Sequence, residues 1–155
     1  MASDKSTRDI QPVTNIDLTR YTGRWYEIAR LPVIFENELD HVTATYSLKE
    51  NGRIEVLNEG LRKGKLQSVK GNASVEDPKV PAKLFVSFFL WFGSDYIVFD
   101  LDPEYRYAMV TGSTKDYLWI LSRTPSMDDK IYSNLLDEAK NKGFETSNLI
   151  FVDQK

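Results

Sequence analysis

The chain has no cysteine and only one histidine, His41. Without cysteine there is no disulfide, no thiolate nucleophile, no lipidated cysteine and no cysteine-based metal site. A catalytic triad would have to recruit His41, which comes at the edge of a predicted strand beside the acidic stretch 36–40, where a surface role is expected. We therefore predict no catalytic residue, no metal site and no cofactor, and we do not expect an enzyme.

Long hydrophobic runs and an excess of basic residues are also lacking. No apolar run approaches about 18 residues, so no transmembrane helix is expected. The net charge of −3 at pH 7 leaves no basic surface of the kind that binds nucleic acid. Residues 1–8 are polar and lack the apolar stretch of a signal peptide.

Length and composition indicate one domain. At 155 residues the chain is long enough to bury a core. Residues 1–15 are mostly polar and are predicted to form a flexible tail. The predicted domain therefore covers residues 16–155.

Turn residues recur at regular intervals and divide the chain into eight strand-like runs. Asn51-Gly52 predicts a two-residue hairpin turn with positive φ, and other pairs that contain glycine or proline mark further turns. The predicted strands are 24–31, 41–49, 53–61, 66–76, 82–90, 95–101, 105–111 and 117–123. This even spacing predicts an all-β fold, an eight-stranded antiparallel up-and-down β-barrel.

One helix is predicted after the last of these strands. Ser126 is the expected N-cap, two aspartates follow in the first turn, and Gly143 suits the left-handed C-terminal cap. The apolar stripe that predicts packing on the outside of the barrel consists of Met127, Ile131, Leu135 and Ala139. Residues 149–152 predict a short final strand, and residues 17–21 a helical turn before the first strand.

The two ends of the strand series carry complementary residues. The first strand opens with Gly23 and Trp25, and the last strand ends in Arg123. A barrel that closes on itself places its first and last strands side by side. We therefore expect Arg123 to lie across the ring of Trp25 and to seal one end through a cation–π contact. A barrel sealed at one end and open at the other is a cup, a shape that suits small apolar molecules.

Alternation along each strand separates interior from exterior side chains. If Arg123 faces Trp25, then Trp119 points inward, while Leu118 and Ile120 point outward under the helix. The interior is then mostly aliphatic and aromatic with a few hydrogen-bonding groups, as in small-molecule sites. The residues predicted to bind a ligand are Tyr46, Val56, Asn58, Val86, Phe88, Tyr96, Tyr117 and Trp119. The alternative is that these side chains simply fill the barrel and satisfy one another.

Large apolar residues on the outer face of the fifth and sixth strands are not expected to be covered by the helix. They are Phe85, Phe89, Ile97 and Phe99. Such a patch predicts a contact surface for a homodimer or a membrane, and an interaction module with a filled barrel is the alternative function. Asp100 fits the alternation poorly, so it either pairs with Arg123 inside or marks a change of alternation in the sixth strand.

Two loops predicted at the open end are apolar, at residues 32–35 and 90–92. They predict either a lid that a ligand passes or a plug that folds inward, and the lid is the interpretation we prefer. The lid predicts that Trp91→Ala weakens ligand uptake with little loss of stability.

Three strings of residues resemble the lipocalin family. They are Gly-Arg-Trp-Tyr-Glu-Ile-Ala-Arg at 23–30, Val-Thr-Ala-Thr-Tyr-Ser-Leu at 42–48 and Tyr-Leu-Trp-Ile-Leu-Ser-Arg-Thr-Pro at 117–125. The resemblance covers residues 16–153 and points to the bacterial outer-membrane branch, with plant temperature-induced lipocalins and apolipoprotein D as relatives. The family's middle Thr-Asp-Tyr motif is replaced here by Leu-Asp-Pro-Glu-Tyr at 101–105.

The resemblance implies a cup that binds fatty acids, lysophospholipids or similar lipids, for carriage or scavenging in membrane maintenance. It implies that Gly23, Trp25 and Arg123 hold structural positions. The implied pocket positions are Tyr46, Asn58, Phe88, Tyr96 and Trp119. A place in the cell envelope, at the outer membrane or in the periplasm, is implied as well, although this sequence shows neither a leader nor the lipidated cysteine of bacterial relatives.

Overall fold

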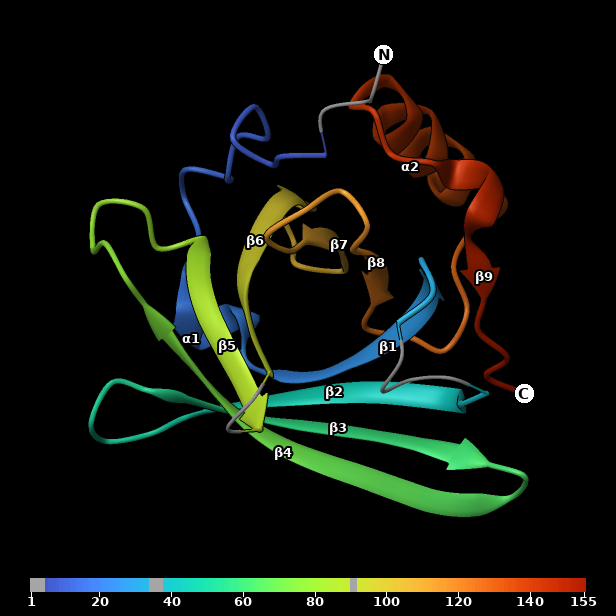
Figure 1. Ribbon diagram of the computed structural model, residues 1–155, viewed down its shortest axis with the longest axis horizontal. Coiled ribbons are helices and arrows are strands. Elements are labelled where there is room, and N and C mark those ends of the chain that lie inside the picture. The colour runs from blue at the N-terminus through green and yellow to red at the C-terminus, as the bar shows by residue number, and fades with distance from the viewer. Residues whose placement is uncertain (1–4, 34–37, 90–91) are drawn as a thin grey trace.

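Antiparallel strands dominate this computed structural model, which describes residues 5–33, 38–89 and 92–155 (Figure 1). The strands are β1 (Gly23–Arg30), β2 (Asp40–Leu48), β3 (Ile54–Arg62), β4 (Lys65–Val75), β5 (Lys83–Phe89), β6 (Phe92–Leu101), β7 (Tyr107–Thr111), β8 (Leu118–Ser122) and β9 (Ile150–Phe151). The helices are α1 (Leu18–Tyr21), α2 (Asp129–Asn141) and the short 3-10 helix η2 (Thr146–Asn148). No helix in the described part of the chain is long and apolar enough to cross a membrane.

The strands pair in chain order from β2 to β8, and β1 closes the sheet between β8 and β2. Its first half pairs with β2 at Gly23–Tyr26, and its second half pairs with β8 from Tyr26 to Arg30. The predicted eight-stranded up-and-down barrel is therefore confirmed. The short strand β9 is also confirmed, and it lies outside the closed ring, beside the end of β1.

A two-residue hairpin turn connects β3 and β4. Lys63 and Gly64 both have positive φ, at 51° and 78°, between the paired residues Arg62 and Lys65. That is the geometry of a type I′ turn. The two-residue turn predicted at Asn51-Gly52 is wrong. Only Gly52 has positive φ there, and the ladder resumes at Leu48 opposite Ile54, which leaves five residues in the connection.

Helix α2 covers the outer face of β7 and β8, as its apolar stripe predicts (Figure 1). Leu135 and Ala139 are buried against Met109, Leu118 and Ile120 in a core between helix and barrel. The N-cap is Asp128, whose carboxylate accepts hydrogen bonds from the backbone N–H of Lys130 and of Ile131. Ser126 was expected in this role. Its carbonyl instead accepts from the hydroxyl of Thr124, one turn before the helix.

The predicted apolar patch on β5 and β6 is contradicted at two of its four residues. Ile97 and Phe99 are only 3% and 6% exposed, because the ring of Phe99 stacks on Phe144 with centroids 5.5 Å apart and Ile10 packs into the same core. Phe85 is 39% exposed, and the side chain of Phe89 lies outside the described part of the structure. Residues distant in sequence thus cover positions of β6 that strand alternation alone predicts to be exposed.

Residues 5–15, which were predicted to be part of a flexible tail, pack along the barrel instead. Ser6 forms a β-bridge with Thr114, and the backbone N–H of Val13 donates to the carbonyl of Val98. Ile10 is 4% exposed. The polar average of this segment conceals two apolar residues, Ile10 and Val13, that pack against the barrel.

The last residues fill the gap where β1 and β2 diverge. The side-chain amide of Gln154 donates to the carbonyls of Glu27 in β1 and Val42 in β2, at 2.7 and 2.8 Å. The N–H of His41 donates to the carbonyl of Asp153. These bonds replace the ladder hydrogen bonds that the two strands do not make with each other.

Candidate functional site

One end of the barrel is sealed by Arg123 and Trp25. The guanidinium Cζ lies 3.9 Å from the centroid of the indole ring, and Trp25 is fully buried. The indole N–H donates to the carbonyl of Tyr21 in α1 at 2.8 Å. Helix α1, Trp25 and Arg123 thereby close this end of the barrel.

Gly23 makes the close approach of Arg123 possible. Its φ is +101°, and a Cβ atom added there would lie 3.2 Å from Nη1 of Arg123. An L-residue rarely adopts such a φ. The glycine that opens β1 therefore serves both the backbone turn and the packing of the guanidinium.

The interior of the barrel contains an apolar cavity toward the other end, which we call the upper pocket. Its empty volume is about 530 Å³, including the part open to solvent. The described residues that line it are Glu27, Ala44, Tyr46, Val56, Asn58, Val86, Phe88, Ser94, Asp95, Tyr96, Val110, Trp119 and Leu121. They come from β1, β2, β3, β5, β6, β7 and β8, so every barrel strand except β4 contributes described residues to the pocket.

The structure brings seven of the eight predicted binding residues together around this pocket. Only Tyr117 is absent from the wall. Its ring stacks on that of Trp119, with centroids 5.8 Å apart and an interplanar angle of 7°. Tyr117 thus lies against a lining residue of the pocket.

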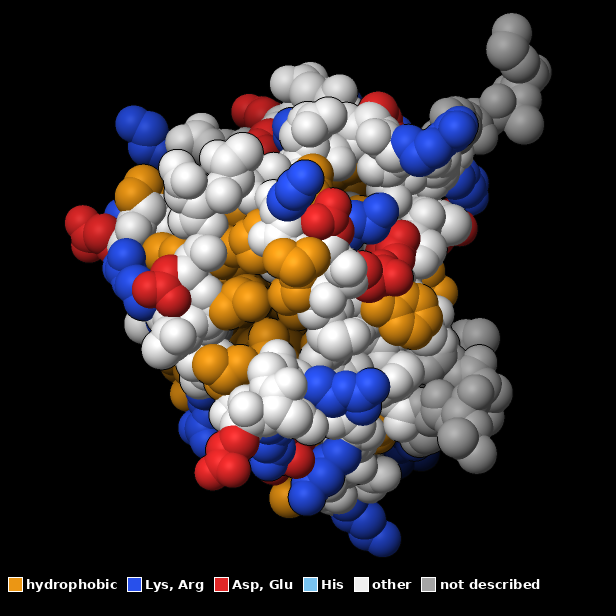
Figure 2. Space-filling model, turned by 90° about the vertical axis from the view of Figure 1, so that its left-hand side faces the viewer, with side chains coloured by type: hydrophobic (Ala, Val, Ile, Leu, Met, Phe, Trp, Pro, Cys, Tyr) orange, Lys and Arg blue, Asp and Glu red, His pale blue; other side chains and the backbone are white. Residues whose placement is uncertain are grey.

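A second, narrower cavity, the lower pocket, lies nearer α1, and its empty volume of about 290 Å³ includes the part open to solvent. Its lining residues are Leu18, Tyr21, Tyr46, Ile54, Val56, Ala73, Leu84, Val86 and Tyr96. Figure 2 faces the side of α1 and of the β2–β3 and β4–β5 connections. Hydrophobic side chains gather there in a central hollow, surrounded by side chains of both charges.

Three tyrosines stand between the two pockets. The hydroxyls of Tyr21 and Tyr96 are 2.6 Å apart, and the hydroxyl of Tyr96 donates to that of Tyr46 at 2.8 Å. Burial raises the pKa of Tyr96 well above its ordinary value and also raises the pKa of Tyr21. The phenols therefore stay neutral, and the polar atoms at this level are directed toward one another.

Glu27 is a lining residue that strand patterning did not single out. It is 3% exposed, and its Oε1 lies 3.6 Å from Nη1 of Arg30, which is 2% exposed. Strict alternation from the inward Trp25 would have placed Glu27 inside. Glu27 was not among the predicted binding residues, because carboxylates are seldom buried without a partner. Glu27 therefore adds a buried carboxylate to a wall that also contains the polar residues Asn58, Ser94 and Asp95.

Asp100 faces outward, away from Arg123, because the β6–β7 register shifts between Val98 and Asp100. The alternative of a change in alternation is thus the correct one. Asp100 meets Glu138 of α2. Burial, the hydrogen bond with Asp100 and the negative charge of Asp100 raise the pKa of Glu138 from 4.5 to about 8, against the opposing effect of Lys142.

His41 lies where Asp153 and Gln154 bridge the diverging strands β1 and β2, and it lines neither of the two pockets. Its Nδ1 is 2.7 Å from a carboxylate oxygen of Asp40, and that contact raises the pKa of the imidazole. Of the predicted lid segments at 32–35 and 90–92, residues 34, 35, 90 and 91 lie outside the described residues.

Known proteins resemble the chain over nearly its whole length. The Lipocalin-like domain matches residues 16–154. The outer membrane lipoprotein Blc of Escherichia coli K12 is 44% identical over 155 residues, which cover 99% of this chain and 88% of that protein. Temperature-induced lipocalin-1 of Arabidopsis thaliana is 38% identical, covering 92% and 81%. Bovine apolipoprotein D is also 38% identical, covering 90% and 78%.

Among solved structures, insecticyanin from the tobacco hornworm Manduca sexta superposes with a TM-score of 0.75. The identity is 21%, and the match covers 97% of this chain and 87% of that one. At this identity the likeness concerns the fold alone, and the fold agrees with the barrel described above. The domain match and the relatives together show that the chain belongs to the lipocalin family.

Proposed function

We propose that the protein binds a slim, single-chain lipid, such as a fatty acid or a lysophospholipid, in the upper pocket and carries or scavenges it. Family membership supports the binding of small hydrophobic ligands and a binding protein rather than an enzyme. The names of the bacterial relatives associate them with the outer membrane. We propose accordingly that the ligand derives from a membrane and that the protein acts in its maintenance within the cell envelope.

The observation that carries this proposal is the upper pocket itself. Its wall is mostly aliphatic and aromatic with a few polar side chains, which is the composition of small-molecule sites. Seven residues that were predicted to bind the ligand from strand alternation line it. Affinity would come mainly from apolar area removed from water, at roughly 25 cal/mol per Å² before ordering costs.

The few polar groups in the wall orient the ligand in this proposal. Asn58 offers its side-chain amide to the ligand, and the hydroxyls of Tyr46 and Tyr96, which bond to each other at 2.8 Å, turn toward a polar group of the ligand. The headgroup of an acyl lipid stays near the open end, where Ser94 and Asp95 contribute to the wall. A chain of small cross-section suits an eight-stranded barrel, which leaves little room inside.

Native mass spectrometry of the purified protein, with extraction of lipids that co-purify, tests the proposal. A fatty acid or lysolipid bound in stoichiometric amount supports it. Titration with both lipid classes should also change Trp119 fluorescence, and the loss of that response in Trp119→Phe identifies the responding ring. A protein that is empty and shows no fluorescence response would favour a filled barrel.

The alternative of an interaction module has lost its main support, since Ile97 and Phe99 are buried. Formation of a homodimer and contact with a membrane surface remain proposals. Sedimentation of the protein with and without liposomes tests both.

A further inference from the structure

Basic charge is concentrated in the hairpin that β3 and β4 form. Four of the ten residues 61–70 are basic and none is acidic, although the whole chain has a net charge of −3. The four are Arg62, Lys63, Lys65 and Lys70, and all are exposed. Within the described part of the chain, neither Lys63 nor Lys65 takes part in an ion pair. The net charge of the chain thus does not reveal this local positive cluster.

An exposed apolar side chain accompanies these lysines. Leu66 directly follows Lys65 and is 64% exposed. It pairs with Leu61 across the ladder, and such partners lie on one face of a hairpin. We call residues 61–66 the hairpin tip. Apolar and basic side chains together are typical of surfaces that bind anionic lipids, where the apolar group enters the acyl boundary and the cations meet the headgroups.

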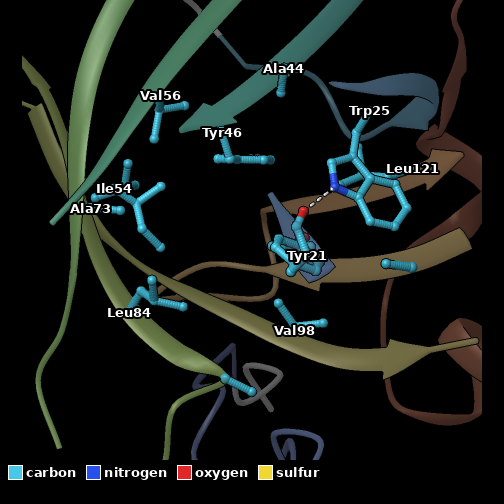
Figure 3. Packing of buried hydrophobic residues seen from close by; sticks show 14 of the residues in the cluster. Tyr21, Trp25, Ala44, Tyr46, Ile54, Val56, Ala73, Leu84, Val98 and Leu121 are labelled. Carbon is cyan, nitrogen blue, oxygen red and sulfur yellow. Dashed lines mark hydrogen bonds between the residues drawn. The ribbon is translucent and has the colours of Figure 1, made fainter. Parts of the chain in front are cut away.

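The hairpin tip lies at the open end of the barrel. Figure 3 shows the sealed end, where the indole N–H of Trp25 donates to the carbonyl of Tyr21. Strand β1 starts there with Gly23, which pairs with Tyr46, and Tyr46 pairs in turn with Val56 near the start of β3. Strand β3 therefore runs away from the sealed end, and the turn that follows it belongs to the open end.

The hairpin tip also projects beyond the neighbouring strands. Pairing of β2 with β3 ends at Asp40 opposite Leu61, and among the described residues pairing of β4 with β5 begins only at Asn72. In Figure 1 the hairpin accordingly extends past the end of β2 at the lower right. Asn58 of the upper pocket lies four residues before Arg62 on β3, so about 13 Å separate the pocket wall from the tip.

We infer that the hairpin tip docks on a membrane surface that contains anionic phospholipids and thereby brings the open end of the barrel to that membrane. The inference rests on the proposed function and adds the surface through which a membrane-derived ligand reaches the upper pocket. Lys63 and Lys65 meet the lipid phosphates as point charges, and Leu66 enters the boundary of the acyl chains. Each lysine near an anionic surface contributes about fivefold to affinity.

The same lysines disfavour a second copy of the chain as the occupant. Two β4 edges that matched residues 65–70 in an antiparallel pair would place Lys65 of one copy opposite Lys70 of the other. Like charges directly opposite one another destabilise a strand pair, and lysines are typical of edges that avoid such pairing. Charge complementarity therefore favours an anionic lipid surface.

Flotation with lipid vesicles measures the contact. The protein should bind vesicles of phosphatidylcholine mixed with phosphatidylglycerol but not vesicles of phosphatidylcholine alone. Binding should be lost between about 0.1 and about 1 M salt, because the Debye length falls from about 10 to about 3 Å. Lys63→Asn combined with Lys65→Gln should weaken binding about 25-fold. Asn-Gly is a favoured pair in type I′ turns, so this double variant keeps the hairpin.

Lys79→Gln combined with Lys83→Gln is the matched control. Both lysines are exposed and lie at the sealed end, in the β4–β5 connection and at the start of β5. This variant loses the same charge and should bind anionic vesicles as the wild type does. Equal losses in the two double variants, or wild-type binding that is independent of phosphatidylglycerol, would overturn the inference.

The lack of cysteine allows a direct test of insertion. Leu66→Cys supplies a single thiol for a nitroxide label, and Leu48→Cys is the control, because Leu48 is 47% exposed at the sealed end of β2. On anionic vesicles the label at position 66 should become protected from a water-soluble relaxation agent, and the label at position 48 should not. Equal accessibility of the two labels would show that the tip does not enter the membrane surface.

Titration with hexadecanoic acid separates the inference from the proposed function. The wild type and the Lys63/Lys65 variant should bind the acid equally, since neither lysine is among the described residues that line the upper pocket. A protein that binds the acid but no anionic vesicle refutes the inference and retains the proposed function. A protein that binds no acid refutes the proposed function, and flotation then decides the docking of the hairpin tip by itself.

Discussion

The guanidinium of Arg123 lies over the indole of Trp25, and the same guanidinium donates hydrogen bonds to backbone carbonyls of four residues. Those carbonyls belong to Arg20, Tyr21, Arg24 and Tyr105. One side chain therefore connects α1, the start of β1 and the β6–β7 connection to the end of β8. Its geometry leads to the first two predictions.

Arg123→Ala should lower the free energy of unfolding by about 2 kcal/mol, because it removes the cation–π contact and the donors to these carbonyls. Arg123→Lys should recover only a minor part of the lost stability, since an ammonium group lacks the planar, forked arrangement of donors in a guanidinium. Denaturant unfolding measures both. Arg24→Ala is the control, because that exposed side chain lies beside the site, and it should change stability by no more than about 0.5 kcal/mol.

Gly23→Ala should destabilise the protein by about 2 kcal/mol. Backbone strain at positive φ accounts for about 1 kcal/mol, and the contact at 3.2 Å with Arg123 adds the rest. Gly52→Ala separates the two causes, because Gly52 also has positive φ but no heavy atom within 4 Å of an added Cβ. Equal decreases in the free energy of unfolding of the two variants would show that the contact with Arg123 contributes nothing to the effect.

Phe99→Asp should cost about 4 kcal/mol or more, because it deletes a buried ring and places a carboxylate in the core between barrel and helix. Phe85→Asp, on the adjacent strand but 39% exposed, should cost about 1 kcal/mol. Thermal unfolding followed by circular dichroism compares them. Similar melting temperatures for the two variants would mean that residues 5–15 and Phe144 do not cover β6 in solution.

The Asp100–Glu138 pair predicts a pH dependence of stability. Since the pKa of Glu138 is raised from 4.5 to about 8 on folding, the folded state retains a proton that the unfolded state loses. Stability should therefore fall as pH rises from 4.5 to about 8 and stay level above that. The groups that face Glu138 are Asp100, Lys142 and Tyr107.

Glu138→Gln should abolish this decrease, because the amide N–H still donates to Asp100 but cannot ionise. The variant should be more stable than the wild type near pH 8 and similar to it near pH 4.5. Urea unfolding at several pH values provides the comparison. A wild type and a variant with parallel pH profiles would show that Glu138 titrates normally in the folded protein.

The barrel and its sealed end were predictable because local patterns and one long-range constraint agree. Turn residues separate the strands, and Arg123 facing Trp25 sets the alternation of β8. The outward positions of that strand then match the apolar stripe of α2. Each strand has only two faces, so a single correct contact determines the orientation of many side chains.

The rest depended on information that a strand pattern does not contain. The burial of Phe99 comes from Ile10 and Phe144, which are far away in sequence. The outward orientation of Asp100 comes from an irregular register, and bulges have weak sequence signatures. Glu27 was missed because a carboxylate is assumed to be exposed, whereas a basic partner three residues later allows its burial.

Closure of the ring through β1 and β8 also bears on how the protein folds. Glu27 pairs with Leu121 and Arg30 with Trp119. The first strand of the barrel therefore pairs with a strand that lies far away in sequence and is synthesised much later. Contacts of such long sequence separation slow folding. Before β8 pairs with β1, the unpaired backbone edge of β1 can form hydrogen bonds with another chain. We therefore expect refolding yield to fall with protein concentration, and variants that weaken the β1–β8 contact to aggregate during folding before they lose native stability.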